Sequence, residues 1–230
     1  AYLVLAAIDL VCVIYVATQL PRERHFVRAA GLARTVVLMV RHFRDRRLVA
    51  TFAVGFGALF TFVTIFTFIN FHLADAPYDF TAAELGSLFI VYLFGVATTP
   101  LTGRLVARFG RRWLVLGAVG AWAIGTGLTA VPHLAVILLG LVIAACSGFI
   151  CQAVSTGYVA YAATEARSSA VGLYVTAYYL GGSAGAVIGG FAWHDAGWLG
   201  CVAIVWLMLA VMAALIFRFW HEPPLQPAPT

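Results

Sequence analysis

The sequence predicts an all-α membrane protein with seven transmembrane helices. Of its 230 residues, 63% are hydrophobic and 10% are charged, so its apolar surface exceeds what a soluble domain of this size can bury. Its apolar runs match the roughly 20 residues that an α-helix needs to cross a bilayer. No run shows the sustained period-two alternation of barrel strands. The predicted spans are residues 1–20, 48–73, 84–103, 113–131, 134–160, 169–193 and 197–219.

The arginines predict how these spans are oriented. All 14 basic residues are arginine: eight lie within residues 22–47, four within 104–112, and Arg167 and Arg218 stand alone. These positions fall in alternate connections and so share one side of the bilayer, which the positive-inside rule makes cytoplasmic. The opposite connections contain no arginine and carry Asp75, Asp79, Glu84, His133, His194 and Asp195. We therefore attribute the net charge of +5 to topology and anionic lipid, and not to nucleic acid.

Residues 21–47 form a long polar connection, which predicts a cytoplasmic basic linker. Apolar residues alternate with arginines there, which favours an amphipathic helix in the membrane surface; a solvated basic loop is the alternative. These apolar residues are Phe26, Val36, Val37, Val40 and Phe43. We expect residues 1–20 to be the last helix of an N-terminal half, 48–219 a C-terminal six-helix half and 220–230 a cytoplasmic tail. Because Ala1 begins inside an apolar run, we expect a fragment without a signal peptide.

Local signals mark the elements of the six-helix part, which divides into three plus three helices. Thr81 followed by Glu84 predicts a capping box that opens the span 84–103. Pro100 predicts a kink late in this span, because proline removes a backbone hydrogen bond. A ridge of small residues, suited to close helix packing, is predicted at Gly181, Gly185 and Gly189.

The connection at residues 103–112 reads GRLVARFGRR and is only long enough to join two helices on one side of the bilayer. Glycines near its two ends permit a tight turn. Its four arginines can lie among anionic headgroups, where each contributes about 1 kcal/mol.

This loop resembles the basic motif of the major facilitator superfamily, glycine-x-leucine-x-aspartate-arginine-x-glycine-arginine-arginine. Further stretches resemble its drug:proton antiporter branch: Leu20-Pro21 with Arg24-His25-Phe26, Arg44-Asp45-Arg46, Phe62-Val63-Thr64, Gly86 to Gly103, Leu173-Tyr174, Tyr178 to Gly181, Trp193-His194 and Gly197-Trp198. The resemblance implies the superfamily fold, with this chain matching helices six to twelve of a twelve-helix protein. Ala107 stands where the motif prefers aspartate, which fits the degenerate second-half copy.

The resemblance also implies a function: proton-coupled efflux of small amphipathic or drug-like compounds by alternating access, in a bacterial inner membrane. It implies no cofactor beyond the proton gradient as energy source. The implied partners are the lipid bilayer, a small-molecule substrate and the missing N-terminal half of the same protein. The loop residues implied in conformational switching are Gly103, Arg104, Arg108, Gly110, Arg111 and Arg112.

Polar side chains within the spans are the candidates for substrate binding, because transporter pockets are mainly apolar with a few placed polar groups. In the aromatic-rich span 48–73 the candidates facing a cavity are Thr64, Thr67 and Asn70. Helices that line the cavity in family members contribute Tyr92, Gln152, Ser155, Tyr178 and Tyr179. Helix-helix hydrogen bonding is the alternative role for these groups.

Asp9 is the candidate for proton coupling, since an ionisable group deep in a span costs about 2.5–3.5 kcal/mol and usually serves a function. It would be protonated in apolar surroundings and would ionise on exposure to water. The alternative is that Asp9 has no such role, because the matching family helix is peripheral.

Other functions remain alternatives at this point. The nearest is a metabolite or sugar importer of the same superfamily, and a seven-helix receptor is more remote. A microbial rhodopsin is excluded, because the chain has no lysine for a retinal Schiff base. We do not expect an enzyme or a metal site, because the spans contain no His-Glu-x-x-His motif, paired carboxylates or serine set beside a histidine.

Overall fold

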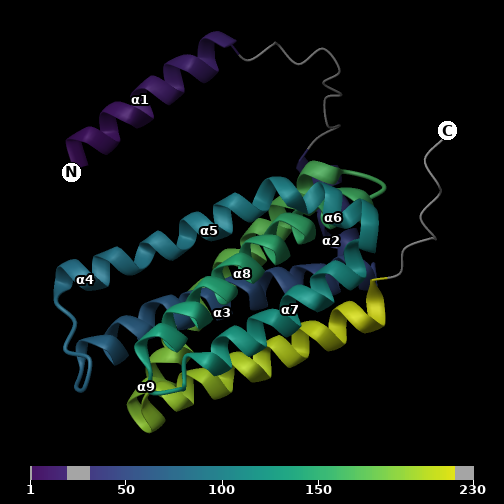
Figure 1. Cartoon of the computed structure of the whole chain (residues 1–230). Helices are drawn as coiled ribbons and strands as arrows, with labels where there is room; N and C mark the ends of the chain where they lie inside the picture. The colour runs from purple at the N-terminus through teal and green to yellow at the C-terminus, as the bar shows by residue number, and fades with distance from the viewer. Residues whose placement is uncertain (1, 20–31, 221–230) are drawn as a thin grey trace. The chain divides into compact units, whose positions relative to one another are not determined.

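The structure, a computed structural model, describes residues 2–19 and 32–220, and all regular secondary structure in these ranges is helical (Figure 1). The chain divides into two compact units, residues 1–35 and 36–230. The first unit contains α1 (Tyr2–Gln19), and α2 (Leu32–His42) crosses the division. The second unit contains α3 (Arg46–Ala74), α4 (Ala82–Ser87), α5 (Val91–Thr98), α6 (Thr102–Phe109), α7 (Arg111–Leu128), α8 (Leu134–Ala162) and α9 (Arg167–Phe219).

Four helical segments in the described residues are long and apolar enough to cross a membrane: 46–74, 82–109, 134–162 and 167–219. The 53 residues of α9 are more than one span needs, and its helical path is broken at Gly197, where φ is 59° and ψ is −146°. This left-handed φ suits a residue without a Cβ. The two arms of α9 therefore correspond to the predicted spans 169–193 and 197–219. α1 and α7 are helices at the positions of two further predicted spans but are not among these four.

The segment 82–109 is one interrupted helix rather than a continuous one. It opens with the predicted capping box, in which the Thr81 hydroxyl and the Glu84 carboxylate each accept a backbone N–H. A 3-10 turn at Leu88–Ile90 separates α4 from α5, and a second at Thr99–Leu101 separates α5 from α6. The second turn contains Pro100, where the sequence predicts a kink; the chain changes there from α-helical to 3-10 geometry. The first turn has no proline and was not predicted.

Helix α3 lies between the two arms of α9, which reverses direction in Figure 1 as its colour passes from green to yellow. On the first arm, a Cβ added to Gly181 would lie 2.0 Å from the carbonyl oxygen of Phe56. On the second arm, Met212 contacts α3 so closely that a Cβ on Gly57 would lie 2.7 Å from its side chain. The glycines of α9 and α3 thus permit helix contacts that a larger side chain would block.

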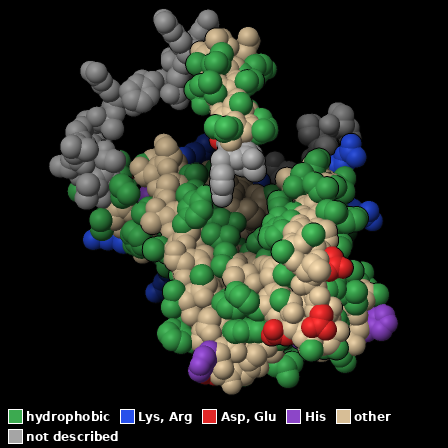
Figure 2. Space-filling view, turned by 90° about the vertical axis from the view of Figure 1, so that its left-hand side faces the viewer, with side chains coloured by type: hydrophobic (Ala, Val, Ile, Leu, Met, Phe, Trp, Pro, Cys, Tyr) green, Lys and Arg blue, Asp and Glu red, His purple; other side chains and the backbone are tan. Residues whose placement is uncertain are grey.

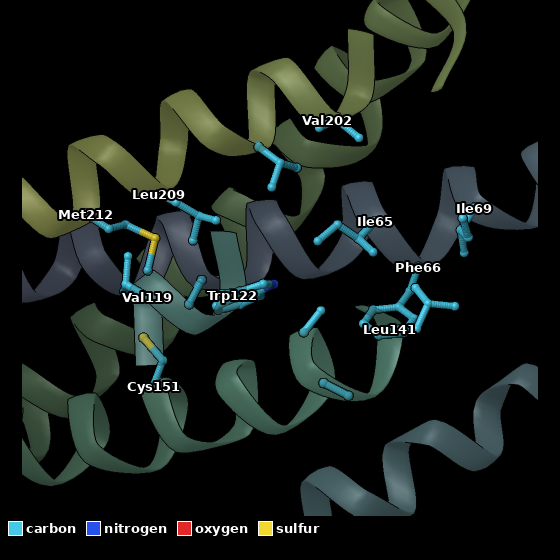
Figure 3. Close-up of a cluster of buried hydrophobic side chains, with 14 of the residues drawn as sticks. Ile65, Phe66, Ile69, Val119, Trp122, Leu141, Cys151, Val202, Leu209 and Met212 are labelled. Carbon is cyan, nitrogen blue, oxygen red and sulfur yellow. The ribbon is translucent and has the colours of Figure 1, made fainter. Parts of the chain in front are cut away.

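The main hydrophobic core fills the space between α3, α7, α8 and the second arm of α9 (Figure 3). Trp122 of α7 is fully buried and lies near the centre of this cluster. Two indole nitrogens of the second α9 arm tie it to α7: Trp198 donates to the carbonyl of Thr129 at 3.0 Å, and Trp206 donates to that of Ala123 at 2.9 Å.

The two ends of the second unit differ in charge. The connection from α3 to α4 carries the exposed acids Asp75 and Asp79, and Figure 2 views this end, where acidic side chains (red) gather. The arginines of α6, α7 and the α2–α3 connection lie at the opposite ends of their helices. The arginines and the acidic residues thus lie at opposite ends, as the sequence predicts. Which end faces the cytoplasm stays a prediction.

The boundaries of the predicted linker and tail differ in detail from the elements observed. Within the predicted linker, α2 is helical, whereas residues 20–31 lie outside the described residues. At the other end, Trp220 is fully buried and stacks on Tyr158 with ring centroids 4.1 Å apart. The packed body therefore includes Trp220, which we had assigned to the tail, and the rest of the tail lies outside the described residues.

Candidate functional site

A cavity of about 140 Å³ lies among α3, α7, α8 and the first arm of α9. Its walls combine aromatic rings and small side chains with one amide and one phenol. The lining residues are Ala58, Leu59, Phe62, Trp122, Gly148, Phe149, Gln152 and Tyr178. Such a surface can hold an apolar or aromatic group and offer it a few hydrogen bonds.

The aromatic wall of this cavity is built by interlocking rings. The ring of Phe62 lies 5.2 Å from that of Tyr92, 5.9 Å from that of Phe149 and 6.3 Å from that of Trp122, measured between centroids. Gly148 makes this arrangement possible, because a Cβ there would lie 2.9 Å from the Phe62 ring and 3.0 Å from that of Trp122. The same surface is therefore both the packing of four helices and the wall of the cavity.

Two of the predicted binding residues, Gln152 and Tyr178, line the cavity together. The Gln152 side-chain oxygen accepts a hydrogen bond of 2.9 Å from the hydroxyl of Tyr174, which fixes the amide. Its amide nitrogen makes no hydrogen bond to any residue that the structure describes, so it remains available as a donor. Tyr178 is half-buried, and its ring stacks on that of Tyr174 with centroids 6.3 Å apart. The cavity thus offers an oriented amide and a phenol.

The other predicted binding residues lie outside this lining. Thr64 is fully buried, and its hydroxyl donates to the carbonyls of Phe60 at 2.8 Å and Gly185 at 3.1 Å, so it joins α3 to α9. Asn70 donates to the carbonyl of Phe66 in its own helix. Thr67 is exposed. Substrate binding by these three residues stays a prediction, and the hydroxyl of Thr64 is already engaged in helix packing.

The remaining three candidates also differ in setting. Ser155 is buried 4.0 Å from the Cys151 sulfur, measured from its oxygen. Tyr92 is half-buried in the aromatic wall, and Tyr179 is 64% exposed on the first arm of α9. The cavity also uses residues that the sequence reasoning did not single out, above all Trp122 and Phe149. The binding residues are predicted from polar side chains within the spans. An aromatic residue in an apolar span does not stand out in the same way.

The basic loop is held to the rest of the second unit by its last two arginines. Gly110 has a φ of 76°, which lets the chain turn sharply from α6 into α7. The Arg112 guanidinium donates to the carbonyl of Phe217 at 2.7 Å and lies 4.7 Å from the centre of that ring. The Arg111 guanidinium lies 4.7 Å from the centre of the Tyr161 ring. These contacts tie the start of α7 to the ends of α8 and α9.

The loop's other positions, Gly103, Arg104, Ala107 and Arg108, are exposed. They have the freedom to meet headgroups or another protein surface, whereas a switching role for the loop stays a prediction. Within the first unit, Asp9 lies on the surface of α1, and proton coupling by this carboxylate also stays a prediction. In the described ranges no three or more His, Cys, Asp or Glu side chains gather as a metal site.

The sequence has relatives among bacterial transport proteins. It is 33% identical to the inner membrane transport protein YnfM of Escherichia coli over 88% of this chain and 49% of that protein. It is 30% identical to the uncharacterized MFS-type transporter YybF of Bacillus subtilis over 90% of this chain and 52% of the relative. An uncharacterized transporter of Buchnera aphidicola from Schizaphis graminum is 31% identical over 76% of this chain and 43% of its own length.

The chain thus spans about half the length of the curated relatives it matches. The sequence profile of the Major Facilitator Superfamily matches residues 76–230, from the α3–α4 connection onward. This match covers most of the second unit, including the basic loop and three of the four helices around the cavity, and it shows that the chain belongs to the Major Facilitator Superfamily of transporters.

Proposed function

We propose that the described helices are part of a proton-coupled efflux transporter for small amphipathic compounds, with residues 48–219 as its second six-helix half. The observation that carries this proposal is the cavity among α3, α7, α8 and α9, whose aromatic wall holds one oriented amide and one phenol. Compounds with an aromatic or aliphatic body and a few polar atoms match such a surface.

In this proposal an N-terminal half of the same protein closes the other side of the substrate path. Support comes from the lengths of the relatives, which are about twice the part that this chain matches. The two halves would rock about the bound substrate, as in transporters built from repeated helix bundles. The Escherichia coli relative is named an inner membrane transport protein, which supports a bacterial inner membrane as the location.

The side chains of the cavity take separate roles. Phe62, Trp122 and Phe149 provide the surface on which the apolar body of the substrate lies. The Gln152 amide and the Tyr178 hydroxyl orient its polar atoms. The other candidates contribute in other conformations of the transporter: Thr64, Thr67, Asn70, Tyr92, Ser155 and Tyr179.

The energy source in this proposal is the proton gradient, and no cofactor takes part. Asp9 is the proton carrier proposed for this chain. Its carboxyl would bind a proton in apolar surroundings and release it to water, which links proton flow to the change of conformation.

The arginine loop serves as the cytoplasmic joint of the second half. Arg111 and Arg112 hold α7 to α8 and α9, so that these helices move as one body. Arg104 and Arg108, which are exposed, would then contact anionic headgroups or the N-terminal half in only one conformation.

A transport assay with the full-length protein in liposomes tests the proposal. Ethidium is a suitable probe because its charge is permanent, so a pH gradient alone does not trap it. An antiporter in vesicles with an acidic interior exchanges outgoing protons for incoming ethidium, which therefore accumulates. If ethidium does not accumulate with the pH gradient in either direction, the efflux proposal is contradicted. A sugar or other metabolite accumulating with an alkaline interior would instead favour an importer.

A substitution in the cavity tests the site itself. Tyr178→Phe removes only the phenol oxygen, and we expect the KM for ethidium or another accepted compound with hydrogen-bonding groups to rise by about three- to ten-fold. Tyr78→Phe is the matched control, because that tyrosine lies in the α3–α4 connection and does not line the cavity. Equal KM values for Tyr178→Phe and Tyr78→Phe would remove Tyr178 from the binding surface.

A further inference from the structure

A second, larger cavity of about 470 Å³ lies where α2, the start of α3 and the α8–α9 connection meet. It shares no residue with the cavity described above. Its lining is mostly polar and charged: Leu38, Arg41, His42, Arg44, Asp45, Leu48, Ala162, Thr164 and Glu165. The function proposed above makes no use of it.

One arginine that lines this cavity has no ion-pair partner among the residues whose structure is described. Asp45 caps α3, accepting the backbone N–H of Arg47 at 2.8 Å. Glu165 pairs with Arg41 at 3.3 Å, in an exposed contact that solvent weakens. Arg44 has no ion-pair partner in the part of the chain that the structure describes. Each acidic side chain in the lining thus has a partner other than Arg44, and the Arg44 guanidinium can donate hydrogen bonds to an anion.

His42 provides a second, independent sign of a ligand. Its side chain lines the cavity, is only 8% exposed, and has an Nε2 atom with no hydrogen-bond partner among the described residues. Buried polar atoms in folded proteins nearly always have a partner. A ligand in the cavity with acceptor oxygens would supply one, provided that the imidazole carries its proton on this nitrogen.

An apolar groove of about 430 Å³ continues from the charged cavity along α2. Val37, Val40, Arg41 and Arg44 line it, so the two arginines belong to both spaces. Val37 and Val40 are 64% and 58% exposed, so they offer an apolar surface directly beside the charged cavity. The two spaces together offer a cationic compartment and an adjoining apolar track.

We propose that this composite groove binds an anionic phospholipid. Its phosphate-bearing headgroup lies between Arg41, His42 and Arg44, and one acyl chain lies along Val37 and Val40. Inorganic phosphate would fill only the charged part and leave the two valines uncovered, which is why we assign the site to a lipid. The bound lipid joins α2 to α3 and to the α8–α9 connection.

The test uses full-length protein in detergent with added phosphatidylglycerol, and native mass spectrometry counts the bound lipids. Arg44→Gln should weaken phosphatidylglycerol binding about five-fold, the effect of one basic group near a membrane surface. Arg44→Lys should keep most of the affinity. Arg218→Gln is the matched control: it removes another exposed arginine, one that does not line the groove, and binding should not change.

Two further comparisons separate a lipid from other anions. Val40→Ser should weaken binding of phosphatidylglycerol but not of inorganic phosphate, and phosphatidylcholine should not compete. Equal losses for Arg44→Gln and Arg218→Gln would overturn the proposal in favour of diffuse surface charge. If millimolar inorganic phosphate displaced the lipid fully and Val40→Ser had no effect, the site would belong to a free anion and the lipid assignment would fall.

Discussion

Helix α3 and the segment 82–109 are both apolar enough to cross a membrane, yet they differ greatly in how much of each is buried against other helices. In their most apolar stretches, 67% of the residues of α3 are buried within the described structure, against 17% for the segment 82–109. Hydropathy therefore identifies both as spans and does not distinguish a central helix from a peripheral one. In a bilayer an apolar side chain is equally acceptable against lipid or protein, so shape decides which helices meet.

Helix α3 can pack at the centre because residues of complementary size meet across its helix contacts. Glycines on the first arm of α9 let α3 approach closely: a Cβ on Gly185 would meet the backbone of Phe60, and a Cβ on Gly189 would meet the ring of Phe68. The segment 82–109 has one comparable contact, where Gly95 lies under the Phe149 ring of α8. Leu88 and Val91 are buried, whereas seven other large apolar side chains are exposed and available to lipid or to further protein: Phe89, Ile90, Leu93, Phe94, Val96, Leu101 and Phe109.

The largest effect should come from filling the contact between α3 and α9. In Gly181→Ala the new Cβ would lie 2.0 Å from the backbone oxygen of Phe56, which cannot rotate away, so the helices must separate. We expect a loss of about 3 kcal/mol in the free energy of unfolding. Gly86→Ala on α4, where nothing lies within 4 Å, should instead stabilise the protein by about 0.5 kcal/mol or more.

The measurement is unfolding of the full-length protein in mixed micelles by titration with sodium dodecyl sulfate, followed by circular dichroism. If Gly181→Ala were as stable as the parent protein, α3 and α9 would not approach each other as closely as described. A strongly destabilised Gly86→Ala would show instead that α4 packs against protein in the full transporter.

A somewhat smaller difference should separate two phenylalanines. Phe60 on α3 is 3% exposed and Phe94 on α5 is 53% exposed. Phe60→Ala leaves a cavity, and we expect a loss of about 2–3 kcal/mol, below the usual range for a buried phenylalanine because transfer from water contributes little in a bilayer. Phe94→Ala should cost less than about 0.5 kcal/mol, since lipid replaces the ring. The same titration measures both, and equal losses would mean that Phe94 is covered by protein.

The sequence was sufficient for features that depend on local chemistry. The Thr81–Glu84 capping box follows from the bonding capacity of two residues and is confirmed. The change to 3-10 geometry at Thr99–Leu101 falls where Pro100 predicted a kink. The reversal at Gly197 falls at the first residue of the predicted span 197–219, where a residue without a Cβ adopts a left-handed conformation. These features depend on residues that lie next to one another in the sequence.

Features that depend on which helices meet were beyond the sequence. The cavity brings together Phe62, Trp122 and Gln152 from three helices. When helices are apolar on all sides, their sequences do not indicate which sides pack against one another. Thr64 shows the same limit: besides the carbonyl of Phe60 one turn earlier, its hydroxyl bonds to a carbonyl 121 positions further along the chain. The polarity of a residue thus predicted that it would have a partner, and only the packing revealed which one.

The smallest effect we expect is the loss of that hydroxyl. Thr64→Val keeps the shape of the side chain but removes the 3.1 Å hydrogen bond to Gly185, the polar link between α3 and α9 at this position. Hydrogen bonds between membrane helices average about 0.6 kcal/mol, and we expect a loss of this size. Thr102→Val is the control on the peripheral segment, because its hydroxyl bonds only to the carbonyl of Thr99 in the preceding turn. If the two variants unfold at equal detergent fractions, glycine packing alone holds α3 against α9. A loss confined to Thr64→Val would instead show that a buried hydroxyl adds specificity to a contact that shape already favours.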